Sequence, residues 1–90
     1  MFLIVYDIMD NRLRTRFAKF LKRFGIRVQY SVFQVENSPR ILDNIQVEIK
    51  SNFEKKFGQA DSVLIYQIPD HACIAKFGHP VDDETDFVIR

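Results

Sequence analysis

The chain has 90 residues and a mass of 10.7 kDa, which provides one hydrophobic core and leaves too little chain for a second. Hydrophobic residues make up 47% and charged residues 28%, and this composition excludes disordered and collagen-like classes. The longest apolar stretch, residues 1–6, is far shorter than the roughly 20 residues of a membrane-spanning helix. We therefore expect a cytoplasmic protein with no membrane partner.

The first predicted elements are a strand over residues 2–6 and a helix after it. The strand is a continuous run of β-branched and aromatic residues, as in a strand covered on at least one face. Asp10 and Asn11 supply N-cap chemistry for the helix, and Gly25 is expected to end it. The apolar residues at helical spacing are Leu13, Phe17, Phe20, Leu21 and Phe24.

Residues 27–36 are strand-like, but the hydrophobic alternation changes phase between Val32 and Phe33. A bulge or corner near residues 30–32 is therefore predicted to divide this stretch into two strands. Gln29, Tyr30 and Ser31 lie at that corner, where they either satisfy a bent backbone or face a ligand. The sequence leaves these two alternatives open.

The second half of the chain predicts a long helix and further strands. Ser38 and Pro39 are typical of an N-cap and a first helical turn, and Gly58 is expected to close the helix. Its apolar residues repeat at every fourth position and are Ile41, Ile45, Ile49, Phe53 and Phe57. Residues 62–68 predict a fourth strand, and residues 72–77 and 87–89 predict short additional strands.

This order of elements predicts an α+β fold, a ferredoxin-like βαββαβ sandwich that forms a single domain over residues 1–90 with an extra C-terminal strand. Two helices would cover one face of the sheet and leave the other uncovered. Since an apolar face of that size is seldom exposed on a monomer, we expect a homodimer formed through the sheets. The tail, residues 81–90, would supply residues 87–89 as an edge strand to the other subunit or to a partner protein.

The net charge is only +1, but the charges are unevenly distributed. Residues 12–35 contain seven Lys or Arg and no acid, whereas four acids crowd residues 82–86. One stripe on the first helix is formed by Arg12, Arg16, Lys19 and Arg23. Such a stripe either tracks a phosphate backbone or is an ordinary solvated helix face.

Asp7 is the candidate metal ligand, because it ends an apolar strand beside a basic helix. A hard carboxylate oxygen with nearby cations suits a magnesium-dependent phosphodiester site, although a lone carboxylate also commonly caps a turn. In a dimer, two Asp7 carboxylates would share one Mg²⁺ at the twofold axis. Arg14 and Arg27 are placed to reach a phosphate near Asp7, and Asp10 is better explained as a helix cap.

Common cofactor motifs do not occur in the sequence, which has no Gly-rich phosphate loop, CxxC pair or GxSxG elbow. Cys73 is the one cysteine, so it has no partner for an internal disulfide. Its apolar neighbours predict a buried packing thiol.

Two motifs together resemble the CRISPR-associated protein two family: Val5-Tyr6-Asp7-Ile8 before the basic helix, and Val28-Gln29-Tyr30-Ser31-Val32-Phe33 after Gly25. The resemblance implies a ferredoxin-like homodimer that works with a larger integrase subunit in spacer acquisition and contacts duplex DNA. Several members are described as magnesium-dependent endoribonucleases or DNases, which adds single-stranded RNA as a candidate substrate.

The resemblance also assigns the candidate site. Asp7 matches the metal-binding aspartate, and the positions implicated around it are Tyr6, Arg14, Arg16, Arg27, Ser31 and Phe33. The residues expected to bind nucleic acid are Arg12, Arg14, Arg16, Lys19, Arg23 and Arg27. Two alternatives remain: a toxin-type ribonuclease of the same fold, and a noncatalytic nucleic-acid-binding or small-molecule module.

Overall fold

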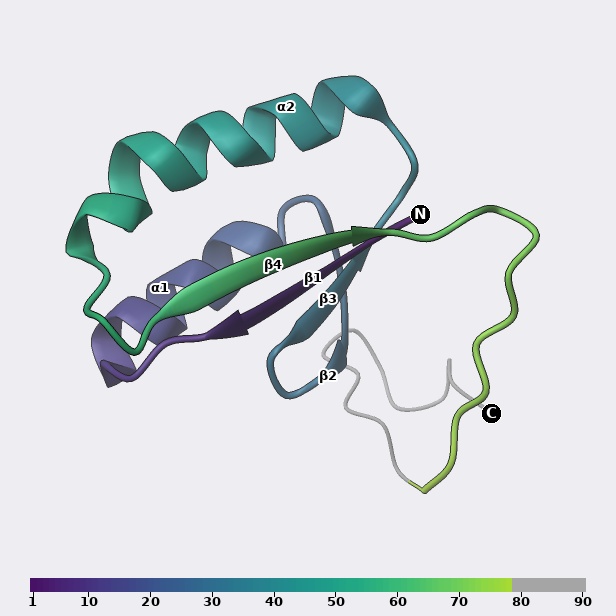
Figure 1. Ribbon diagram of the computed structural model, residues 1–90, viewed down its shortest axis with the longest axis horizontal. Coiled ribbons are helices and arrows are strands. Elements are labelled where there is room, and N and C mark those ends of the chain that lie inside the picture. The colour runs from purple at the N-terminus through teal and green to yellow at the C-terminus, as the bar shows by residue number, and fades with distance from the viewer. Residues whose placement is uncertain (79–90) are drawn as a thin grey trace.

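The computed structural model describes residues 1–78, and its elements follow the predicted order (Figure 1). The strands are β1 (Phe2–Asp7), β2 (Gly25–Gln29), β3 (Val32–Val35) and β4 (Ser62–Gln67). The helices are α1 (Asn11–Leu21), α2 (Pro39–Glu48), the π-helical η1 (Ile49–Phe53) and the 3₁₀-helical η2 (Glu54–Lys56). The strands form one antiparallel sheet in the order β2-β3-β1-β4, which confirms the ferredoxin-like prediction.

The core lies between the helices and one face of the sheet. Alternation along β1 turns Phe2, Ile4 and Tyr6 to this face, where all three are buried. Phe17 of α1 packs edge-on against Tyr6, with ring centroids 5.0 Å apart, and at the same separation against Phe53 of η1. Such edge-to-face pairs add about 0.5–1.5 kcal/mol each beyond the area they bury. The aromatic residues therefore hold both helices on β1.

Helix α1 begins where predicted but ends earlier. The Asp10 side chain accepts a hydrogen bond from the Leu13 amide at 2.8 Å, which confirms Asp10 as the N-cap. The helix ends at Leu21, and Gly25 opens β2 rather than stopping the helix. A Cβ at Gly25 would stand 2.2 Å from the carbonyl oxygen of Gln34. Gly25 is therefore required because β2 approaches β3 closely at this point.

Strands β2 and β3 form a hairpin, so the predicted division of this stretch is confirmed. The turn lies at Tyr30 and Ser31, between the ends of the two strands. The register also shifts between Arg27 and Gln29, as in a β-bulge. Arg27 pairs with the buried Phe33 and so belongs to the helix-covered face.

The second helix is not one regular α-helix. It changes to π-helical geometry at Ile49–Phe53 and to 3₁₀ geometry at Glu54–Lys56. A four-residue spacing exceeds the about 3.6 residues of an α-helical turn, so a stripe at that spacing drifts around the helix. The wider π turn compensates for this drift and keeps Ile45 and Phe53 together in the core.

The face of the sheet opposite the helices is only partly uncovered. Residues 72–77 form no strand, contrary to prediction. Instead, residues 74–77 line a cavity of about 240 Å³ with Leu3, Val28, Val32 and Gln34, among other residues. On β4, Leu64 and Tyr66 remain 52% and 50% exposed.

Cys73 is exposed, so the prediction of a buried thiol is wrong: its apolar neighbours leave the sheet after β4 and do not reach the core. The predicted strand at 87–89 and the edge-strand role of residues 81–90 lie outside the described residues.

Candidate functional site

Asp7 and Tyr6 point to opposite faces of β1, because successive strand residues alternate. Tyr6 is 3% exposed and lies beneath α1, whereas Asp7 is exposed at the strand's carboxyl end. Asp7 pairs with Ser62 of β4. The Asp7 carboxylate is therefore open to solvent on the β1–β4 half of the sheet.

Arg14 fixes the loop that follows Asp7 from the α1 side. Its Nη1 donates to the carbonyl oxygens of Ile8 and Met9 at 2.8 and 3.2 Å, and its Nη2 donates to the Asn11 side chain. The sequence predicts that Arg14 reaches a phosphate near Asp7. The structure places its guanidinium on the backbone of the loop between Asp7 and α1.

Asp61 fixes the same loop from the β4 side. Its two carboxylate oxygens accept hydrogen bonds from the amides of Met9, at 2.9 Å, and Gly58, at 2.8 Å. The hydrogen bonds from Gly58 and then Met9 lower the pKa of Asp61 below its usual value. The sequence pattern gave no sign of this residue, because its two partners lie in different loops.

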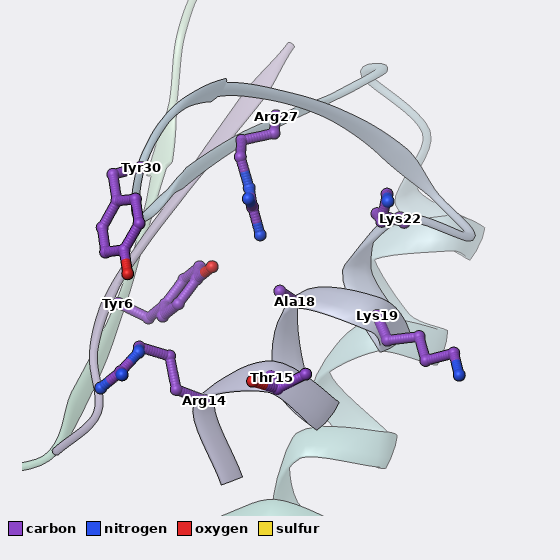
Figure 2. Close-up of a pocket in the computed structure, with 8 residues that line it drawn as sticks. All are labelled: Tyr6, Arg14, Thr15, Ala18, Lys19, Lys22, Arg27 and Tyr30. Atoms are coloured by element: carbon purple, nitrogen blue, oxygen red, sulfur yellow. The ribbon is translucent and has the colours of Figure 1, made fainter. Parts of the chain in front are cut away.

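A basic pocket lies on the helix side of the sheet, between α1 and the β2–β3 hairpin (Figure 2). Its volume is about 460 Å³. Its lining residues are Tyr6, Arg14, Thr15, Ala18, Lys19, Lys22, Arg27 and Tyr30. Four of these described residues are basic and none is acidic, a composition that favours an anion.

The pocket brings together several predicted site residues. Tyr6, Arg14 and Arg27 line it, and Lys19 lies at its margin with its side chain directed away from the centre (Figure 2). Asp7 does not line it. Tyr6, Arg14 and Arg27 therefore form one candidate site and Asp7 forms another. The sequence predicts a single site for all four residues.

Phe33 in the core and Ser31 in the β2–β3 turn contact the pocket residues Arg27 and Tyr6. Phe33 is fully buried, with the Arg27 guanidinium carbon 5.4 Å from its ring centroid and the Tyr6 ring stacked 6.3 Å away. The carbonyl oxygen of Ser31 accepts a hydrogen bond from the Tyr6 amide at 3.0 Å. These contacts position Arg27 and Tyr6.

The predicted basic stripe is only partly a helix face. Arg12, Arg16 and Lys19 are exposed on α1, whereas Arg23 is exposed beyond the end of that helix. The guanidinium of Arg16 lies 6.0 Å from the Phe53 ring centroid, and that of Arg23 lies 5.6 Å from Phe24. Arg16 on α1 and Arg23 beyond its end are therefore each held partly in place by an aromatic ring.

The residues present satisfy the requirements of a magnesium site only in part. Within residues 1–78, no group of three or more His, Cys, Asp or Glu side chains is arranged to hold a metal. Mg²⁺, however, is commonly held by one or two carboxylates together with waters and substrate phosphates. An exposed Asp7 supplies one such ligand, and a second copy of the chain would supply another.

The described part of the chain has no helix that is long and apolar enough to cross a membrane.

Comparison with known proteins gives consistent matches. Residues 1–74 match the family model described as CRISPR associated protein Cas2. A CRISPR-associated endoribonuclease Cas2 of Chloroflexus aurantiacus is 37% identical, over 96% of this chain and 94% of that relative. A crystal structure of a hypothetical Thermus thermophilus protein superposes with a TM-score of 0.70 and 27% identity, covering 91% of this chain and 95% of the other. Streptococcus pyogenes Cas2 shares the fold, with a TM-score of 0.65 and 24% identity over 78% of this chain and 87% of the other.

Proposed function

Because the chain belongs to the CRISPR-associated Cas2 family, we propose that it is a homodimeric subunit of CRISPR spacer acquisition. In this role it binds duplex DNA, bridges integrase subunits and cleaves phosphodiester bonds with Mg²⁺. The observation that carries the proposal is the exposed Asp7 carboxylate at the end of β1, directly before the basic surface of α1.

The exposed surface of α1 supplies the nucleic-acid contact. Arg12, Arg16 and Lys19 lie along it, and α1 contains no acid that would repel phosphate. Lys and Arg that neutralise phosphates release counterions, which gives affinity without base specificity. This suits a subunit that holds DNA of any sequence, and Arg23 and Arg27 extend the charge beyond the helix.

Asp7 is the proposed Mg²⁺ ligand in this site. Bound Mg²⁺ would stabilise the charge that develops on the scissile phosphate. Asp7 contributes an exposed oxygen ligand, while Arg14 and Asp61 hold the loop that follows it. The relatives' endoribonuclease names support RNA as a further substrate.

A second copy of the chain completes the metal site in this proposal. Asp7 lies on the β1–β4 half of the sheet, where Leu64 and Tyr66 are half exposed. Pairing through that half would bury these apolar side chains. The two Asp7 carboxylates would then approach the twofold axis and share one ion.

The test is cleavage of single-stranded RNA and duplex DNA by the wild type and Asp7→Asn, with Mg²⁺ and with EDTA. We expect Asp7→Asn to lower the cleavage rate in Mg²⁺ to the level seen in EDTA, because an amide is a poorer ligand than a carboxylate. Asp43→Asn is the matched control, since it removes one exposed carboxylate from α2. It is expected to cleave like the wild type.

Duplex DNA binding measured in EDTA, where Mg²⁺-dependent cleavage does not occur, tests DNA binding separately from cleavage. The dissociation constant is expected to rise steeply with salt, and to the same extent in wild type and Asp7→Asn. Wild-type cleavage by Asp7→Asn would overturn the assignment of Asp7. Spacer integration with the integrase subunit that survives in Asp7→Ala would make the protein a scaffold, whereas salt-independent duplex binding would contradict the whole proposal.

A further inference from the structure

The basic pocket is a chemically distinct site from Asp7. Its cations come from separate parts of the chain: Arg14, Lys19 and Lys22 from α1 and its C-cap, and Arg27 from β2. Folding gathers these charges around one cavity, and none of its lining residues within residues 1–78 is acidic. Cations gathered around one cavity create a positive potential there, which attracts an anion.

Arg27 provides a directional anion-binding group at the centre of the pocket. Its side chain projects from β2 toward α1, and the Tyr6 hydroxyl turns toward the same space (Figure 2). The guanidinium carbon lies 5.4 Å from the centroid of the Phe33 ring, which is within the range of a cation–π contact. A planar guanidinium carries paired N–H groups whose spacing matches two phosphate oxygens.

Tyr30 provides an aromatic surface beside these cations. It lies in the β2–β3 turn and is 67% exposed, although it also lines the pocket. Proteins bind unpaired bases by stacking them on exposed aromatic side chains. A cavity of about 460 Å³ is in the size range of small-molecule sites, so it accommodates one nucleotide and is too small for a duplex.

We propose that this pocket binds one unpaired nucleotide, with its phosphate on Arg27 and Lys22 and its base on Tyr30. The ligand chemistry is that of a nucleoside monophosphate, either free or at the unpaired end of a strand. The inference rests on the proposed nucleic-acid function for its choice of ligand, but it requires neither Mg²⁺ nor Asp7.

Binding of AMP and of a short 5′-phosphorylated single-stranded oligonucleotide, measured by calorimetry in EDTA, tests the inference. Lys22→Met and Tyr30→Leu are each expected to weaken binding by about tenfold or more, since a lost phosphate contact or stacked base has an effect of that size. Lys56→Met, at an exposed position outside the pocket, is the matched control and is expected to bind like the wild type.

The two sources of the ligand are distinguished in the same experiment. Binding of both AMP and the oligonucleotide supports a site open to free nucleotides, whereas binding of the oligonucleotide alone supports a strand end. If neither binds, or if Lys22→Met and Lys56→Met weaken binding equally, the inference is overturned.

Duplex DNA binding identifies which proposal has failed. Tyr30→Leu is expected to retain the wild-type affinity for a blunt duplex, because Tyr30 lies outside the basic surface of α1. A wild type that binds the duplex but neither single-stranded ligand would overturn the pocket alone. A wild type that binds AMP but no duplex would support the pocket proposal and contradict the proposed function.

Discussion

At the residue scale, two side chains hold the loop that carries the chain from Asp7 into α1. Arg14 donates to the carbonyls of Ile8 and Met9, and Asp61 accepts from the Met9 amide. Charge-assisted hydrogen bonds to the backbone are stronger than neutral ones. The position of Asp7 thus depends on residues that would not themselves touch a metal.

Asp61 predicts a dependence of stability on pH. Its folded-state pKa lies below the ordinary 3.8, because the carboxylate accepts hydrogen bonds from Gly58 and Met9. Its contribution is therefore fully present above that ordinary value and is lost as the pH falls through the lower folded-state pKa. We expect the free energy of unfolding of the wild type to exceed that of Asp61→Asn at neutral pH, with the difference shrinking below about pH 4.

Urea unfolding between about pH 2 and pH 7 measures this difference. Asp43→Asn controls for removal of one negative charge at an exposed position. If the difference in free energy of unfolding between wild type and Asp61→Asn stays constant down to the lowest pH, the Asp61 carboxylate does not hold the loop.

At the element scale, the β2–β3 hairpin decides where Arg27 and Tyr30 stand. Arg27 pairs with Phe33, and Tyr30 lies in the turn that joins the two strands. Gly25 allows β2 to lie close to β3 at the open end of the hairpin, beside Val35. Gly25, which is not among the residues that line the pocket, therefore helps to set its shape.

Gly25→Ala is expected to destabilise the protein by about 1–3 kcal/mol, the usual cost of forcing an extra methyl group into a packed site. The added Cβ would stand 2.2 Å from the Gln34 carbonyl oxygen and 2.9 Å from Val35 Cγ2. Gly58→Ala is the control, because its Cβ would meet only Asp61 Oδ2, at 3.8 Å. Urea unfolding that gives equal stabilities for the two variants would contradict the close approach of β2 to β3.

At the scale of the whole molecule, the two faces of the sheet have different surroundings. The helices cover one face, and residues 74–77 line a cavity with the β2–β3 half of the other. The β1–β4 half keeps Leu64 and Tyr66 half exposed. A dimer formed through this half would bury an apolar surface that also carries Asp7.

We therefore expect the wild type to sediment as a dimer at micromolar concentration and Tyr66→Lys to sediment as a monomer, because a buried lysine without a partner opposes association. Val47→Lys is the matched control: Val47 is 63% exposed on α2, away from the proposed interface. Analytical ultracentrifugation measures both. A monomeric wild type, or a dimeric Tyr66→Lys, would contradict the proposed interface.

The sequence by itself determined the order of elements, the Asp10 cap and the position of Asp7 at a strand end. These features depend on residues close together in the chain, whose side-chain period and capping chemistry act locally. The same local patterns gave wrong predictions for Gly25, which opens β2 and does not end α1, and for Cys73, which is exposed. Both features depend on which residues pack against these positions.

Only the tertiary structure separated Asp7 from the pocket of Tyr6, Arg27 and Tyr30. Neighbouring strand residues point to opposite faces, so Tyr6 and Asp7 are adjacent in sequence and belong to different sites. Tertiary structure also placed Asp61 on the loop after Asp7, through a hydrogen bond that spans 52 residues. Such contacts are decided by the distances between packed elements, and no pattern along the chain records those distances.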